Sequence, residues 1–193
     1  MNSIAVFCGS SEGNDEMILK DSYNLGKILA ERNINLVYGG SKLGLMGQVA
    51  RGALDHGGKV TGVIPDFLKT KEVVHPGLTG LITTKDMHER KMKMHELSEG
   101  FIALPGGFGT LEELFEIVTW GQLGLHANPI GLLNSNGYYD ELIAMLKTMV
   151  RKGLLKKANF DLLLIAENIE ELLEKMANFK PMPTPKWMNK DQT

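Results

Sequence analysis

Three glycines stand within four positions at 106–109, directly before a threonine and, one residue later, two adjacent glutamates. The segment reads Leu104-Pro105-Gly106-Gly107-Phe108-Gly109-Thr110-Leu111-Glu112-Glu113. Glycine lets a backbone approach a ligand closely, and the start of a helix offers unpaired N–H groups and the positive end of the helix dipole. The pattern therefore predicts a phosphate site, in which Thr110 donates from its hydroxyl or caps the helix.

The same segment also has a plainer interpretation, a glycine-rich turn in which Thr110 caps a helix and the glutamates complement its dipole. It is not a Walker A loop, and Glu112 stands where a dinucleotide fingerprint needs its last glycine. Consecutive helical residues point about 100° apart, so only one of Glu112 and Glu113 can aim at a ligand. The sequence leaves open which one.

A second glycine-rich segment spans 39–47, with glycines at 39, 40, 44 and 47. It follows an apolar run, which predicts another close approach of the backbone, to the same ligand as the first segment. No Asp or Glu ends the next apolar run at 63–65, where an NAD site would bind the ribose hydroxyls. This absence counts against a dinucleotide.

A charge cluster occupies 86–91, upstream of the first glycine segment. On a helix, Asp86, Arg90 and Met94 share one face and Lys91 is adjacent. Such a cluster is commonly a solvated helix face. Alternatively, the guanidinium of Arg90 presents a fork of donors that suits a phosphate or a carboxylate.

Short apolar runs alternate with helical patterns along the whole chain. We expect strands at 4–8, 36–38, 60–64, 81–83, 101–104, 129–133 and 162–166, with 66–80 mostly loop. We expect helices at 15–32, 45–54, 87–97, 110–123, 139–151 and 169–178. This alternation predicts an α/β fold, a parallel sheet with helices on both faces, whose ligands bind beyond the carboxyl ends of the strands.

Composition sets the remaining expectations. The 193 residues fit a single nucleotide-binding domain at 1–180 and a short tail at 181–193. A net charge of −2 gives no general attraction to nucleic acid or membrane, so we expect neither as a partner. Cys8 is the single cysteine, and neither a signal peptide nor an apolar run of roughly 20 residues occurs, which predicts a cytoplasmic protein. We expect no metal, with His88 and His95 on the surface.

The glycine segment at 105–113 matches the PGGxGTxxE signature of the LONELY GUY family of cytokinin riboside 5′-monophosphate phosphoribohydrolases. Met87-His88-Glu89-Arg90-Lys91, the loop at 39–47 and the segments 118–120 and 129–134 resemble other sequences shared by that family. The motifs occur together and in order, and the resemblance covers about residues 3–175. One departure is Ser41, where the family usually has a third glycine.

The resemblance implies a Rossmann-like homodimer that splits a cytokinin nucleotide or AMP into free base and ribose 5-phosphate, without a cofactor. It implies Arg90 and Glu113 as the catalytic pair. The implied substrate-binding positions are Glu72, Lys91, Gly107, Phe108, Gly109, Thr110, Leu111, Glu112 and Thr119. Glycosidic cleavage passes through an oxocarbenium-like state, which a carboxylate stabilises. We therefore expect Glu113 beside the ribose, with Glu112 as the alternative. Arg90, which stays protonated, is expected to orient Glu113 or contact the base.

Three other functions remain open. The same fold could hold a nucleotide or a molybdenum cofactor as a non-catalytic carrier or sensor, which would need phosphate donors but no carboxylate at the sugar. A nucleosidase could act broadly on nucleoside monophosphates without a hormone role. A sugar-phosphate hydrolase would release phosphate instead of base.

Overall fold

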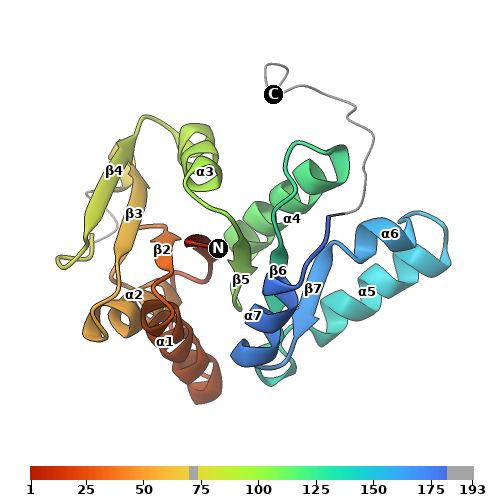
Figure 1. Ribbon diagram of the computed structural model, residues 1–193, viewed down its shortest axis with the longest axis horizontal. Helices are drawn as coiled ribbons and strands as arrows, with labels where there is room; N and C mark the ends of the chain where they lie inside the picture. The colour runs from red at the N-terminus through yellow and green to blue at the C-terminus, as the bar shows by residue number, and fades with distance from the viewer. Residues whose placement is uncertain (70–73, 182–193) are drawn as a thin grey trace.

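The computed structural model describes residues 1–69 and 74–181, which form a seven-stranded parallel sheet in the order β4-β3-β2-β1-β5-β6-β7 (Figure 1). The strands are β1 Ser3–Phe7, β2 Asn35–Tyr38, β3 Val60–Pro65, β4 Gly80–Thr84, β5 Phe101–Ala103, β6 Ile130–Leu133 and β7 Leu163–Ala166. The chain order reverses between β1 and β5, the kind of switch point at which open parallel sheets bind ligands. The predicted α/β class is confirmed.

Helices cover both faces of the sheet because the central strands are buried on both sides. Alternate β1 residues enter different cores, Ile4 and Val6 one, Ala5 and Phe7 the other. Three helices complete the first core: α1 Glu16–Glu31, α2 Gly44–Asp55 and α7 Ile169–Ala177. Three others complete the second: α3 Met87–Glu96, α4 Phe108–Leu123 and α5 Asp140–Arg151.

The start of α4 differs from the expectation. The helix begins at Phe108 rather than at Thr110, and its N-cap is Gly107, which makes no side-chain cap. Thr110 is buried and packs over Gly106, where a Cβ would lie 2.1 Å from its Oγ1. Of the two roles expected for Thr110, capping the helix is therefore wrong, because the helix begins two residues earlier, with Gly107 at the N-cap position.

Other boundaries also differ modestly. The segment expected to be loop contains a short 3₁₀ helix, η1 Asp66–Leu68, and two further elements were not predicted: η2 Ser135–Gly137 and α6 Lys157–Phe160. The strand expected at 81–83 is confirmed as β4. Of the predicted tail, 182–193 lie outside the described residues, and the domain boundary at 180 stays a prediction. Within the described part of the chain, no helix is long and apolar enough to cross a membrane.

Candidate active site

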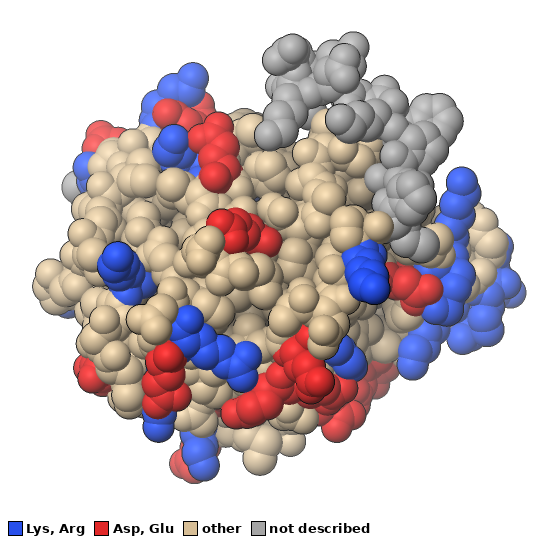
Figure 2. Space-filling view, in the orientation of Figure 1, with Lys and Arg blue, Asp and Glu red and all other residues tan. Residues whose placement is uncertain are grey.

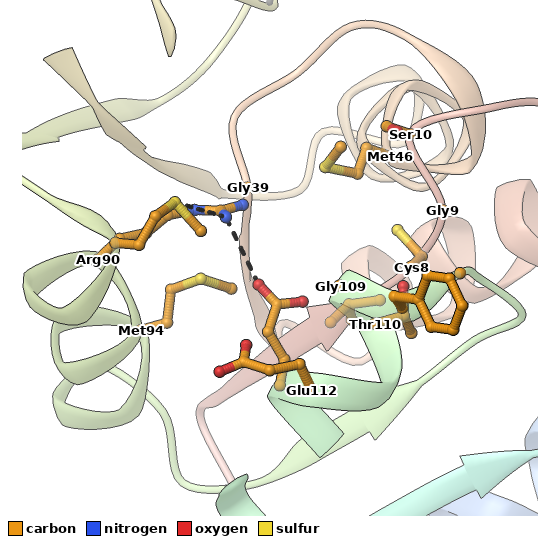
Figure 3. Close-up of a pocket in the computed structure, with 15 residues that line it drawn as sticks. Cys8, Gly9, Ser10, Gly39, Met46, Arg90, Met94, Gly109, Thr110 and Glu112 are labelled. Carbon is orange, nitrogen blue, oxygen red and sulfur yellow. Dashed lines mark hydrogen bonds and ion pairs between the residues drawn. The ribbon is translucent and has the colours of Figure 1, made fainter. Parts of the chain in front are cut away.

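A pocket of about 290 Å³ opens at the carboxyl ends of the central strands, between α3 and α4 (Figure 3). The α4 side supplies polar groups and the sheet and α3 supply mostly apolar ones. Its lining consists of Val6, Cys8, Gly9, Ser10, Gly39, Met46, Met87, Arg90, Met94, Gly107, Phe108, Gly109, Thr110, Glu112 and Glu113. Both predicted catalytic residues, which are 23 positions apart in the sequence, therefore meet in one cavity.

Arg90 and Glu113 form a buried ion pair across this pocket. Nη1 of Arg90 lies 3.6 Å from Oε1 of Glu113, and the two side chains are only 10% and 11% exposed. A dashed line in Figure 3 marks this ion pair. Nε of Arg90 donates to the carbonyl of Val63 at 3.1 Å, which fixes the guanidinium plane against β3. Arg90 is therefore not on a solvated helix face, because its charge is held inside the molecule.

The protonation of Glu113 is poised near neutrality. Burial raises the pKa of Glu113 to about 7, with the charge of Glu112 adding to the rise and the charge of Arg90 opposing it. A carboxyl group whose pKa lies near the working pH can both accept and return a proton. Perturbed carboxyls in clefts are frequent at functional sites, so this residue suits acid–base chemistry.

The start of α4 forms the polar end of the pocket. The first helical hydrogen bond runs from the Leu111 N–H to the Gly107 carbonyl at 3.1 Å, so the preceding amides of the first turn have no helical acceptor. A Cβ built at Gly107 or at Gly109 would meet no heavy atom within 4 Å. Phe108, 94% exposed, stands at the mouth. This end has the amides and the open space that an anionic group requires.

Lys91 gives the two adjacent glutamates, Glu112 and Glu113, different positions. Its Nζ lies 2.5 Å from Oε1 of Glu112 and 2.9 Å from Oε1 of Glu116, and its side chain is 10% exposed. Burial alone would lower the pKa of Lys91, but the hydrogen bonds to these two carboxylates outweigh it and raise the pKa. Glu112 is thus held at the rim while Glu113 faces inward. Lys91 itself does not line the pocket, and its substrate contact stays a prediction.

Of three other predicted binding residues, two do not line the cavity and the third lies outside the described residues. Thr119 is exposed on α4 and donates its hydroxyl to the Phe115 carbonyl at 2.7 Å. Leu111 packs against the core beneath the sheet. Glu72 falls outside the described residues. Their substrate-binding roles stay predictions.

The loop at 39–47 borders the pocket through Gly39 and Met46, and its contact with a ligand stays a prediction. Only Gly39 of its glycines lines the pocket, and a Cβ there would lie 2.3 Å from Nη2 of Arg90. Gly44 has φ +58° and packs against the backbone of Ser10. Ser41, the departure from the family pattern, is buried and accepts a hydrogen bond from the Leu43 N–H at 3.1 Å. Gly39 and Gly44 thus lie against other segments of the protein, which leave no room for a side chain at these positions.

Sulfur-containing side chains form one wall of the pocket, which was not predicted from the sequence. Met46, Met87 and Met94 occur at helical spacings that resemble ordinary core positions, and Cys8 directly follows β1. Burial raises the pKa of the Cys8 thiol far above its usual range, so it remains neutral. The position of Cys8 at a strand end was the one available signal.

The histidines differ from each other. His88 is exposed as expected, but His95 is half-buried and stacks on Phe101 with ring centroids 5.7 Å apart, so its surface placement is wrong. The reason is that α3 turns this side chain toward the sheet. Among residues 1–69 and 74–181, no three His, Cys, Asp or Glu side chains are grouped so as to hold a metal ion.

Solved structures resemble this fold over nearly its full length. The molybdenum cofactor binding protein of the phototrophic bacterium Rippkaea orientalis superposes with a TM-score of 0.67 at 25% identity, covering 91% of this chain and 94% of that one. The molybdenum cofactor carrier protein of Chlamydomonas reinhardtii gives 0.68 at 20% identity, covering 91% and 95%, and at that identity shows the fold alone. Fold and pocket define a Rossmann-like α/β protein with a pocket at the switch point of its sheet, where open parallel sheets bind ligands.

Sequence relatives narrow this class. Residues 46–176 match a family model described as "Possible lysine decarboxylase". The chain is 44% identical to the cytokinin riboside 5′-monophosphate phosphoribohydrolase LOG5 of Arabidopsis thaliana, over 93% of this chain and 78% of that one. It is 43% identical to the probable phosphoribohydrolase LOGL3 of Oryza sativa subsp. japonica, over 91% and 83%. The chain belongs to the LONELY GUY family.

Proposed function

We propose that this protein hydrolyses the N-glycosidic bond of a nucleoside 5′-monophosphate, either a cytokinin riboside 5′-monophosphate or AMP, to free base and ribose 5-phosphate. The observation that carries the proposal is a buried Glu113, paired with Arg90 and close to the open first turn of α4. The relatives at 42–44% identity are named as phosphoribohydrolases of cytokinin riboside 5′-monophosphates, which supports the same chemistry here.

In this proposal the Glu113 carboxylate lies beside C1′, the anomeric carbon of the substrate. As the C1′–N bond breaks, positive charge grows on the ribose, and a carboxylate in a low-dielectric pocket stabilises it. The same carboxylate accepts a proton from the attacking water. Overall, water adds its hydroxyl to C1′ and its hydrogen to the departing base nitrogen, so atoms balance without a further reactant.

Arg90 and the α4 segment are assigned to positioning. Arg90 keeps Glu113 ionisable despite its burial and holds its carboxyl toward the pocket. The amides from Gly107 to Thr110 would bind the 5′-phosphate as a handle that places the scissile bond beside Glu113. The pocket-lining residues of the described chain include no lysine that could form a Schiff base, so the lining gives no support to the chemistry that the family model's description suggests.

A cytoplasmic homodimer is the proposed working form. The resemblance to the LONELY GUY family supports a homodimer, and Thr119, a proposed substrate contact, lies on an exposed face of α4 with Phe115. In the proposed homodimer the second copy packs on this face, and Thr119 would contact the substrate of that copy. The single free cysteine, Cys8, supports a reducing compartment.

The test is incubation of the purified protein with AMP and with isopentenyladenosine monophosphate, following base release by chromatography. Glu113→Gln is expected to lower turnover by about 10³-fold or more while AMP still binds, because only the transition state needs the charge. Glu112→Gln, which removes the rim carboxylate, is the matched control and should retain most of the turnover.

The other outcomes separate the alternatives. Normal turnover in Glu113→Gln removes this residue from catalysis. Binding of AMP with no base released from either substrate favours a carrier or sensor, and release of inorganic phosphate favours a sugar-phosphate hydrolase. Release of adenine as fast as of the prenylated base indicates a broad nucleosidase.

A further inference from the structure

Basic side chains surround one exposed leucine where α5 ends and α6 begins. We call this surface the Leu154 patch, and its members are Lys147, Arg151, Lys152, Leu154, Lys156 and Lys157, all exposed. Residues 142–160 contain these five basic residues and no acidic one, although the whole chain carries a net charge of −2. Figure 2 shows the corresponding gathering of Lys and Arg atoms at the right-hand edge of the molecule, where Figure 1 places α5 and α6.

The backbone fixes the exposure of Leu154. Helix α5 ends in a Schellman motif, in which the Gly153 N–H donates to the Val150 carbonyl at 3.0 Å and the Leu154 N–H donates to the Met149 carbonyl at 2.9 Å. Gly153 has φ +73°, as this motif requires. An apolar residue at the position of Leu154 commonly packs back on the last helical turn. Here Leu154 remains 84% exposed.

The neighbouring leucine makes the contrast clear. Leu155 packs against the core on the α5 side of the sheet and anchors the turn. With its backbone hydrogen-bonded on one side and the partly buried Leu155 packed on the other, Leu154 projects from a rigid tip. Its exposure is therefore built into the turn and does not depend on loop motion.

Most of the patch charge is not neutralised within the described residues. Lys157 pairs with Asp161 and lies 5.7 Å over the Phe160 ring. The other four basic residues form no salt bridge with any described residue, and Arg151 donates instead to Oγ1 of Thr148 at 2.6 Å. The patch therefore presents a local positive field on a weakly acidic protein, which the net charge conceals.

We propose that the Leu154 patch docks on the surface of a membrane containing anionic phospholipid, with Leu154 inserted among the headgroups. Each Lys or Arg near such a surface adds attraction, and a rigid apolar side chain among them adds partitioning that charge alone does not give. A nucleic acid would match the charge but leave Leu154 in water. The combination of charge with an exposed leucine therefore favours lipid.

The test is flotation of the full chain with phosphatidylcholine vesicles, with and without phosphatidylserine, at low and at high salt. Binding is expected only with phosphatidylserine, about tenfold or more above neutral vesicles, and it should fall at high salt. Leu154→Ser is expected to weaken binding about tenfold without changing the charge. Lys152→Glu with Lys156→Glu is expected to abolish it.

The matched control reverses two exposed basic residues, Lys20→Glu on α1 with Arg32→Glu at the C-cap of that helix, and so changes the net charge by the same amount. This control should bind vesicles more than tenfold better than the patch double variant, and circular dichroism should show all variants folded. The proposal is overturned by absence of binding to phosphatidylserine vesicles at low salt, or by equal loss in the α1 control. It is also overturned if a single-stranded oligonucleotide binds equally to wild type and Leu154→Ser while vesicles do not bind, since the surface would then serve nucleic acid.

Discussion

The two glycine-rich loops border the same pocket, but the protein fills the space beside one and leaves the space beside the other open. In the 39–47 loop, a Cβ at Gly39 would meet Arg90 and Met46, and one at Gly44 would meet the backbone of Ser10. In the 106–109 segment, Gly106 packs against Thr110, but a Cβ at Gly107 or Gly109 would meet nothing within 4 Å. Glycine thus serves chain packing at Gly39 and Gly44 in the first loop, and leaves room for a ligand at Gly107 and Gly109 in the second.

This difference divides the labour of the pocket. The filled loop seats the guanidinium of Arg90 beside Glu113, so the charged pair is ordered before any substrate arrives. The open segment presents first-turn amides to a group that comes from solvent. A preorganised charge beside an unoccupied anion site is the arrangement that electrostatic catalysis needs.

The largest expected effect is on the stability of the filled loop. Gly44→Ala should lower the free energy of unfolding by at least about 3 kcal/mol, because the new Cβ combines a left-handed backbone with a contact of 2.3 Å to the carbonyl carbon of Ser10. Urea unfolding followed by circular dichroism measures this. A loss below about 1 kcal/mol would mean that the loop can move aside and that the comparison between the loops fails.

The next effect concerns the carboxyl group between the two loops. The folded pKa of Glu113, about 7, lies above its ordinary value of 4.5, so its contribution to stability is fully present below pH 4.5 and is lost as the pH rises toward 7. Relative to wild type, Glu113→Gln should therefore gain about 3 kcal/mol between pH 4.5 and pH 8.

Urea unfolding of both proteins at the two pH values measures that gain, and Glu141→Gln, an exposed carboxyl on α5, is the control. If the two proteins differed in free energy of unfolding by the same amount at both pH values, Glu113 would ionise in the folded protein without a loss of stability. The buried pair would then not be the strained element of the pocket.

A smaller effect is expected where the filled loop touches Arg90. Gly39→Ala should reduce turnover about 10- to 100-fold, since a Cβ 2.3 Å from Nη2 displaces the guanidinium from Glu113. The clash involves the ends of two flexible side chains, Arg90 and Met46, so unfolding should change by only about 1 kcal/mol. Steady-state kinetics with AMP measures the loss. If Gly39→Ala retained wild-type turnover, catalysis would not depend on this position of the Arg90 guanidinium.

The smallest effect should be seen in the open segment. Gly109→Ala is expected to weaken AMP binding about tenfold, because the methyl group enters the space in front of the amides. Stability should stay level or rise by up to about 1 kcal/mol, since alanine favours a helix over glycine. Calorimetric titration and thermal unfolding measure the two quantities. Undiminished affinity would place the phosphate elsewhere and remove the contrast with Gly39.

Much of the architecture could be predicted from periodicity. The strand at 101–104 and the helices at 15–32 and 139–151 follow from apolar runs and helical spacing, and the structure has an element at each of these places. The four-residue α6 escaped prediction because so short a helix carries no periodic signal. The start of α4 was misplaced because Thr110, a good cap residue by type, is drawn into packing over Gly106.

The sequence by itself determined the α/β class and the order of the predicted strands and helices. It also indicated that Arg90, Glu113 and a glycine-rich helix start lie at one edge of the sheet. These follow from local patterns, and the carboxyl ends of parallel strands share an edge. Only the tertiary structure decided that Glu113 is the buried glutamate of the pocket and Glu112 the exposed one, because Lys91 on a different helix holds Glu112 at the rim. It alone also decided which glycines are filled, because a Cβ contact depends on chain segments that are distant in sequence.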